Sequence, residues 1–164
     1  ELVVAIFAIS LLRVLIGVGG AALLAVPIFG FWLPGALGWA LLPYLAILLA
    51  FGWTIGMIIA GLVLRLGLGA ETLAWGVIFL IQPISGVFYP IAVLPQPLQW
   101  AAWLLPSAPV FEGMRAVLIE GRFDVGLLLW ALAALAGWAV IAALAFIRLF
   151  EHARDEGLLL RQGE

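Results

Sequence analysis

The sequence predicts an all-α integral membrane protein, with four transmembrane helices and a re-entrant or interfacial helical pair before the last of them. Three observations predict this class. Hydrophobic residues make up 67 % of the 164 residues and charged residues only 10 %, and the mean hydropathy is +1.31, which is typical of membrane-spanning chains. Four apolar runs are long enough to cross a bilayer. Six of the nine prolines lie between residues 81 and 120, where no long apolar run is unbroken.

The composition also excludes several classes of function. The seven basic residues are all arginine and the net charge is −2, so no basic patch for nucleic acid is expected. Cysteine is absent, which excludes disulfides, thiolate zinc sites and cysteine nucleophiles. The one histidine, His152, lies in a charged tail and is expected to be a solvated surface residue. No catalytic, metal-binding or phosphate-binding pattern is present, so we expect no catalytic residue and no cofactor on this chain.

The first span is predicted at residues 14–31, about 27 Å of helix. Arg13 precedes it within the same apolar run and is expected to mark the membrane boundary, because a buried charge is costly. The run has no small-residue cleavage site and does not resemble a signal peptide. We interpret the chain as a piece of a longer protein that lacks its N-terminal part.

The second span is predicted at residues 37–64, long enough to cross with tilt or a kink. Gly52, Gly56 and Ala60 repeat at four-residue spacing and form a seam of small residues, where another helix can approach closely. Two interpretations stay open: ordinary packing between helices of this subunit, or a specific dimer seam.

The third span is predicted at residues 72–89, interrupted at Pro83. The short turn before it carries two charges, Arg65 and Glu71, which forbid deep burial. These two residues either face a cytoplasmic partner, such as an ATPase, or form a solvated turn.

The proline-rich stretch that follows predicts two short helices on the outer side, at residues 97–105 and 109–120, since proline favours the first turn of a helix and breaks its interior. Glu112 and Arg115 are three residues apart and can pair. Such a pair either pins the re-entrant element or contacts a polar or anionic headgroup. The fourth span is predicted at residues 126–147.

Four spans place both ends of the chain on one side of the membrane. If the ends and the tail at residues 148–164 are cytoplasmic, five arginines lie inside and two outside, as the positive-inside rule requires. The inner set is Arg13, Arg65, Arg148, Arg154 and Arg161, and the outer set is Arg115 and Arg122. The proline-rich stretch then faces the outer side.

The proline-rich stretch carries several motifs in order. Residues 85–95 read Ser-Gly-Val-Phe-Tyr-Pro-Ile-Ala-Val-Leu-Pro, and Leu-Pro at 105–106 and Glu-Gly-Met-Arg at 112–115 follow. In type and spacing these elements resemble the membrane subunit of a type-2 ATP-binding-cassette (ABC) exporter, and the likeness extends over the whole chain, as spans three to six of six. The resemblance implies an outer gate and re-entrant motif made of Ser85, Gly86, Phe88, Tyr89, Pro90, Pro95, Pro106, Glu112 and Arg115.

The resemblance also implies a function. The chain would be a single transmembrane domain of a permease that moves a lipid-linked glycan, lipid or drug-like substrate outward. ATP and magnesium would bind a separate nucleotide-binding subunit, and a second permease copy or related half would complete the assembly among membrane lipids. The location implied is the bacterial inner (cytoplasmic) membrane, with a multi-pass chain whose ends are both cytoplasmic. The coupling helix that docks on the ATPase would lie in the missing N-terminal part.

Two other functions compete with this one. A non-catalytic membrane assembly or scaffold protein fits the composition but gives the proline-rich stretch no role. An integral membrane enzyme acting on lipids usually carries intramembrane clusters of Asp, His or Glu, and the sequence has none.

Overall fold

The computed structural model describes residues 2–30, 35, 38–67 and 69–156. All regular elements in these ranges are helical, which confirms the predicted all-α class. The chain divides into two compact units, residues 1–41 and 42–164, and each is described by itself.

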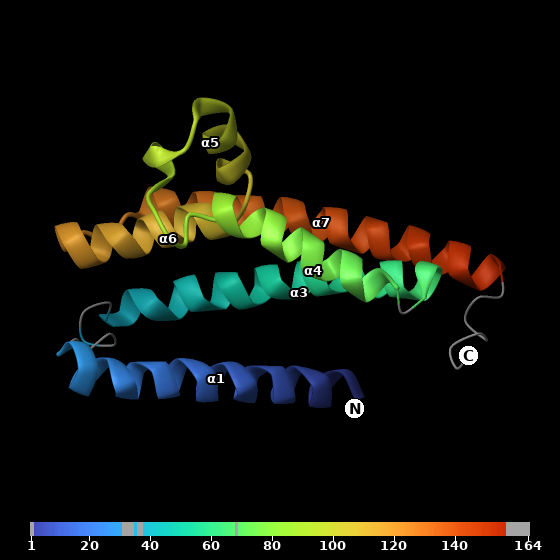
Figure 1. Cartoon of the computed structure of the whole chain (residues 1–164), viewed down its shortest axis with the longest axis horizontal. Helices are drawn as coiled ribbons and strands as arrows, with labels where there is room; N and C mark the ends of the chain where they lie inside the picture. Colours follow the sequence, from blue (N-terminus) through green and yellow to red (C-terminus); the bar gives the residue numbers. More distant parts are fainter. Residues whose placement is uncertain (1, 31–34, 36–37, 68, 157–164) are drawn as a thin grey trace. The chain divides into compact units, whose positions relative to one another are not determined.

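The first unit is built on one helix, α1 (Leu2–Phe29), of 28 residues (Figure 1). The helix runs unbroken through Arg13, since no Gly or Pro interrupts it there. The predicted span 14–31 therefore occupies only the second part of α1, and its last residue lies outside the described ranges. Pro27 lies in the last turn of the helix.

Two helices in the described residues are long and apolar enough to cross a membrane. The first is the run Gly38–Leu66, in which a short 3-10 turn, η1 (Gly38–Ala40), leads into α3 (Leu41–Leu66). The second is α7 (Val125–Asp155). These helices contain the described part of the predicted span 37–64 and the whole predicted span 126–147.

The helix at the predicted third span is shorter than the sequence predicts. It consists of α4 (Ala70–Ile81), of 12 residues, and one 3-10 turn, η2 (Gln82–Ile84). Residues 85–90 then leave the helix and bend, so the predicted span 72–89 is helical only as far as Ile84. Pro83 weakens the helix here, because it has no N–H to donate to the preceding turn. Gly86 then turns the chain away with φ of +76°.

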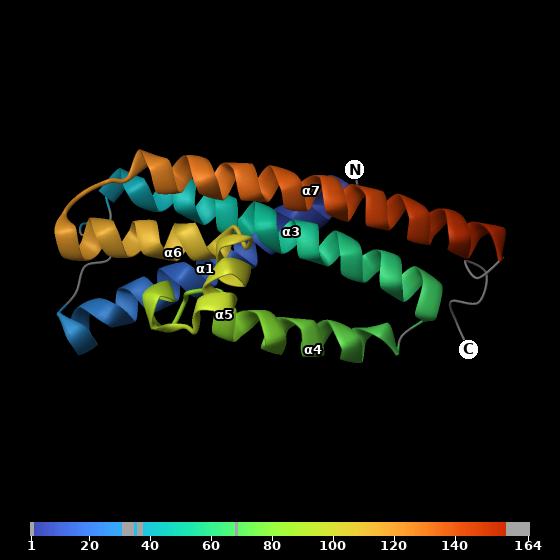
Figure 2. The same ribbon diagram turned by 90° about the horizontal axis from the view of Figure 1, so that it is seen from above.

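The helices α3 and α7 run in the same direction (Figure 2). Near the start of α3, the ring of Tyr44 lies 5.8 Å from the ring of Phe123. Further along, Phe51 meets Trp138 edge to face at 5.5 Å. Near the end of α3, a Cβ added to Gly61 would lie 3.0 Å from Leu149 of α7. Because these contacts advance together along α3 and along the chain from Phe123 into α7, the two helices are parallel neighbours.

Between α4 and α7 the chain forms a compact cap of short helices. These are η3 (Ile91–Val93), α5 (Gln96–Trp103), α6 (Ser107–Arg115) and the π-helical turn η4 (Ala116–Glu120) that continues α6. The bounds of α5, and of α6 together with η4, are close to those of the predicted helices at 97–105 and 109–120. A small core joins them, formed by Ile91, Leu94, Ala102 and Ala108. The helix α6 packs along α7 and runs opposite to it, as Figures 1 and 2 both show.

A close approach between α3 and α6 sets the position of the cap. Tyr44 is fully buried, and its ring lies directly over Gly113 of α6. A Cβ added to Gly113 would lie 2.6 Å from Tyr44 Cζ and 2.9 Å from Cε1, and would overlap the hydroxyl group. Only glycine leaves room for this ring.

We predict that Gly113→Ala lowers the free energy of unfolding by about 1–3 kcal/mol, because the added methyl group overpacks this contact. The measurement is thermal or detergent-induced unfolding of the full-length protein in micelles. Gly52→Ala is the matched control: nothing lies within 4 Å of a Cβ added there, so helix propensity should raise stability by about 0.5–1 kcal/mol. Equal stabilities of Gly113→Ala and the parent protein would contradict the prediction.

Candidate functional site

The loop at residues 85–90 folds back on the end of η2. Ser85 Oγ donates to the carbonyl of Gln82 at 2.7 Å, and Tyr89 Oη donates to the carbonyl of Pro83 at 2.6 Å. Gly86 turns the chain with φ of +76°, a left-handed conformation that glycine adopts without strain. Side chains of the loop thus add hydrogen bonds to carbonyls at this helix end, including that of Gln82, which also accepts from the Ser85 amide at 3.3 Å.

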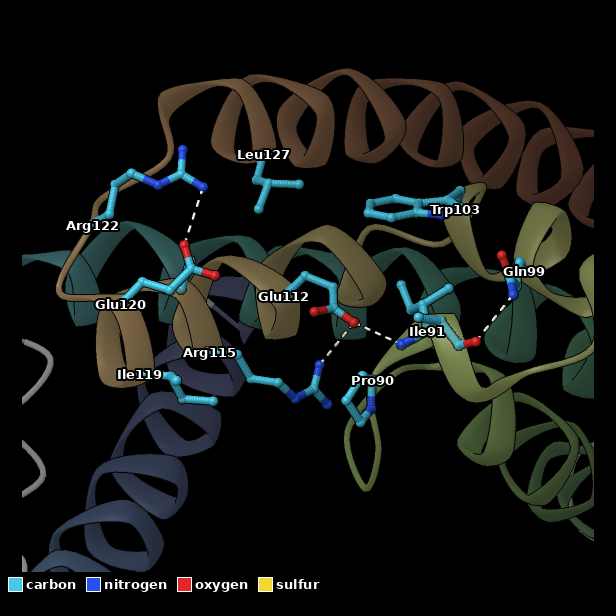
Figure 3. A pocket seen from close by; sticks show the side chains of 12 residues that line it. Pro90, Ile91, Gln99, Trp103, Glu112, Arg115, Ile119, Glu120, Arg122 and Leu127 are labelled. Carbon is cyan, nitrogen blue, oxygen red and sulfur yellow. Dashed lines mark hydrogen bonds and ion pairs between the residues drawn. The ribbon is translucent and has the colours of Figure 1, made fainter.

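Two charged residues of α6 hold this loop. Glu112 Oε1 accepts a hydrogen bond from the Ile91 amide at 2.7 Å and lies 3.1 Å from Arg115 Nη1. Arg115 Nη2 donates to the carbonyls of Gly86 and Tyr89, the latter at 3.0 Å. Figure 3 shows Glu112 directed toward Ile91, with Arg115 beside it. We call this set of contacts the loop clamp.

The geometry of the loop clamp explains its residue types. Arg115 and Glu112 are only 22 % and 20 % exposed, and a charge at that depth needs a partner. A guanidinium group is a planar fork of donors, so one arginine reaches two carbonyls and a carboxylate together. The two side chains lie three residues apart on one helix face. A single ion pair therefore binds two carbonyls of the loop and the amide of Ile91, which directly follows the loop.

An open groove of about 460 Å³ lies beside the loop clamp. Its wall is part apolar and part charged (Figure 3), and is formed by Pro90, Ile91, Ala92, Gln99, Trp103, Glu112, Arg115, Ala116, Ile119, Glu120, Arg122 and Leu127. The two glutamates and two arginines cancel in formal charge. The groove is thus amphipathic without carrying a net charge.

The rim of the groove is held by weaker contacts. Arg122 lies 3.3 Å from Glu120 and 3.0 Å from Asp124, and its side chain is 63 % exposed. Asp124 also accepts from the amide of Leu127 at 3.2 Å and so caps the start of α7. Exposed ion pairs of this kind contribute only about 0–1 kcal/mol. The exposed ion pairs of the rim therefore serve as a control for the effect of removing the more buried pair of the loop clamp.

The remaining residues implied by the resemblance are not part of the loop clamp. Phe88 is 69 % exposed and Pro95 is also exposed, whereas Pro106 is buried at the start of α6. The small-residue seam at Gly52, Gly56 and Ala60 is exposed, and nothing lies within 4 Å of a Cβ added to either glycine. Within the described part of residues 42–164, α3 approaches α7 through a different glycine, Gly61.

The polar turn after α3 stays apart from the groove lining. Arg65 is exposed in the last turn of α3. Glu71 lies in the first turn of α4, and its side chain is outside the part of the chain that the structure describes. The two interpretations of this turn, a partner contact or a solvated turn, therefore both remain predictions.

Sequence reasoning missed two tryptophans of α7. Trp130 Nε1 donates to the carbonyl of Trp103 at 3.0 Å, and Trp138 Nε1 donates to the carbonyl of Leu104 at 2.9 Å. Both acceptors lie at the end of α5, where carbonyls lack helical partners. The tryptophans themselves were a signal in the sequence, since an indole in an apolar span needs an acceptor for its N–H. The sequence alone did not say which carbonyl would supply it.

Gln99 was also missed as a wall residue of the groove. Its amide nitrogen donates to the carbonyl of Leu94 at 2.7 Å and stabilises the turn before α5. Among the described residues, no group of three or more His, Asp or Glu is placed to hold a metal ion. The side chains of this site thus bind backbone groups of the chain itself and fix the wall of the groove.

Comparisons with protein-family models, with curated proteins and with solved structures find no match for this chain.

We predict that Glu112→Ala speeds amide hydrogen exchange in residues 86–95, because the Ile91 amide loses its acceptor. A bond to a charged group contributes about 1.5–3 kcal/mol, so exchange should speed roughly tenfold or more. The measurement is hydrogen–deuterium exchange of the full-length protein in lipid nanodiscs, read by mass spectrometry.

Glu120→Ala serves as the control for this measurement, since it removes an exposed pair on the same helix. It should leave exchange in residues 86–95 unchanged. If the two variants exchange alike, the loop clamp does not hold the loop.

Proposed function

We propose that this chain is the membrane subunit of an ABC exporter of the type-2 class. It moves a lipid-linked glycan, a lipid or a drug-like substrate outward, and a separate subunit hydrolyses the ATP. The loop clamp is the observation that carries the proposal. The Ser-Gly-Val-Phe-Tyr-Pro and Glu-x-x-Arg motifs that underlie the resemblance lie more than 20 residues apart in sequence, yet they bond to each other.

The direction of α3 and α7 supports four spans. If two parallel neighbours both cross a membrane, the chain that joins them must return across it. Among the described residues between them, the longest helix is α4, which follows α3 directly and is continued by η2. Their 15 residues give about 22 Å of helix at the α-helical rise, somewhat less than the hydrocarbon thickness. The bent loop at residues 85–90 completes this return, and α1 supplies the remaining span.

The same topology supports an outer location for the groove. The cap lies between η2 and the start of α7, hence on the side where α3 also starts. Under the positive-inside rule that side is the outer one, since it carries two arginines against five. A bacterial inner membrane, with both ends cytoplasmic, follows from this orientation within the proposal.

The wall of the groove suits a gate better than a binding site for one fixed ligand. Its charges already pair with each other, so an amphipathic molecule meets polar groups on one side and apolar groups on the other. In this proposal the nucleotide-binding subunit supplies the free energy, and the permease changes between inward- and outward-facing states by moving rigid helices. The loop clamp keeps the outer loop ordered during that movement.

The test uses the full-length protein, reconstituted in lipid vesicles with a candidate ATPase subunit. ATP hydrolysis is measured while lipid-linked glycans, lipids and amphipathic drugs are added in turn. One class should stimulate hydrolysis. Arg115→Lys should reduce that stimulation roughly tenfold, because lysine cannot form the same fork of bonds, while both subunits still co-purify.

The control in this assay is Trp75→Phe, which alters an exposed residue of α4 away from the groove and should leave stimulation unchanged. If the chain neither associates with an ATPase nor changes its rate with any class of substrate, the exporter proposal is wrong and a scaffold role is favoured.

A further inference from the structure

The turn between α5 and α6 is fixed to α7 by two indoles. The backbone amides of Leu104 and Leu105 donate to carbonyls three residues earlier and close α5. The indole of Trp130 donates to the carbonyl of Trp103, and that of Trp138 to the carbonyl of Leu104. The acceptors belong to consecutive residues, whose Cα atoms are about 3.8 Å apart. The donors lie eight residues apart on α7, about 12 Å along its axis. The two side chains therefore converge on the turn from both directions along α7.

Two bonds that converge from opposite directions fix the position of the α5–α6 turn along α7, whereas two parallel bonds would allow it to slide. If the turn slid along α7 toward Val125, the bond from Trp138 would lengthen, and a slide the other way would lengthen the bond from Trp130. Trp138 is also held from α3, since Phe51 meets its ring edge to face at 5.5 Å. The turn is thus locked in register with α7 and, through Trp138, with α3.

This register matters to the groove because the same turn carries part of its wall. Trp103 lines the groove, and its own carbonyl is the acceptor for Trp130. Figure 3 draws the ring of Trp103 above Ile91 and Glu112, and Trp103 packs against the small core that contains Ile91. A shift of α7 would consequently move Trp103 relative to the loop clamp on α6.

We propose that Trp130 and Trp138 are positioning residues that lock the α5–α6 turn to α7, and that through them a displacement of α7 changes the shape of the groove. The helix α7 has 31 residues and extends about 46 Å, which is longer than the thickness of the hydrocarbon core, about 30 Å. The second half of the proposal, in which the displacement is driven by the ATPase, rests on the proposed function.

The first experiment tests the lock without any partner. These 164 residues contain no cysteine. Ala102→Cys therefore introduces a single thiol into them, at a fully buried position of α5, and any cysteine elsewhere in the full-length protein is replaced by serine. Its labelling rate by N-ethylmaleimide is measured for the full-length protein in lipid vesicles. Trp130→Phe and Trp138→Phe should each speed labelling about threefold, and the double variant about eightfold, since interhelical hydrogen bonds in membranes average about 0.6 kcal/mol.

Two controls separate the hydrogen bond from the ring. Trp75→Phe removes the same volume at an exposed site of α4 and should leave the rate unchanged. Replacement of Trp138 by β-(3-benzothienyl)alanine keeps the ring size but has no N–H, and should match Trp138→Phe. An unchanged rate in the double variant, or a similar increase with Trp75→Phe, would overturn the lock.

The second experiment tests the coupling. The labelling rate of Ala102→Cys is compared before and after the bound ATPase is trapped with vanadate. Trapping should change the rate in the parent protein and leave it unchanged in the double tryptophan variant. An equal response of both proteins would overturn the coupling. If no ATPase binds the chain, the proposed function fails, while the labelling rates of the first experiment still decide the lock.

Discussion

The cap before α7 depends on the need to satisfy backbone groups where the chain is not helical. Prolines and glycines break the helices between residues 81 and 124 and leave carbonyls and amides without helical partners. In an apolar environment each such group is costly unless it is bonded. The loop clamp provides hydrogen-bond partners for the loop at residues 85–90 and for the amide of Ile91. The indoles of Trp130 and Trp138 provide them for the carbonyls at the end of α5. Without these bonds the broken stretch could not stay folded beside apolar helices.

The two sets of bonds join different parts of the cap to different helices. Glu112 and Arg115 join the loop to α6, whereas the tryptophans join the α5–α6 turn to α7. The helix α6 is in turn fitted to α3, where Tyr44 covers Gly113. The groove therefore has one wall tied to α6 and another tied to α7. Its shape follows the relative position of these two helices, and any change in that position is passed to the groove.

The sequence predicted the helical class, the two long apolar helices and the approximate places of α5 and α6, because these depend on local composition and on proline positions. It did not predict that α4 and η2 end at Ile84, since Pro83 could also have kinked a continuing helix. The choice between Gly61 and the seam at Gly52 and Gly56 depends on helix rotation, which no local pattern fixes. The pairing of Glu112 with Arg115 followed from spacing. Their bonds to Gly86, Tyr89 and Ile91 depend on contacts more than 20 residues away in the chain.

The reliance on directional bonds has a physical reason in a chain of this composition. Lipid tails are as apolar as leucine, so burying apolar side chains gives little drive for helices to associate within a bilayer. Such packing also tolerates small shifts, because apolar contacts have no preferred direction. A hydrogen bond weakens steeply with distance and angle. A cap held by Arg115, Trp130 and Trp138 is therefore more sharply defined in position than one held by its small core of Ile91, Leu94, Ala102 and Ala108.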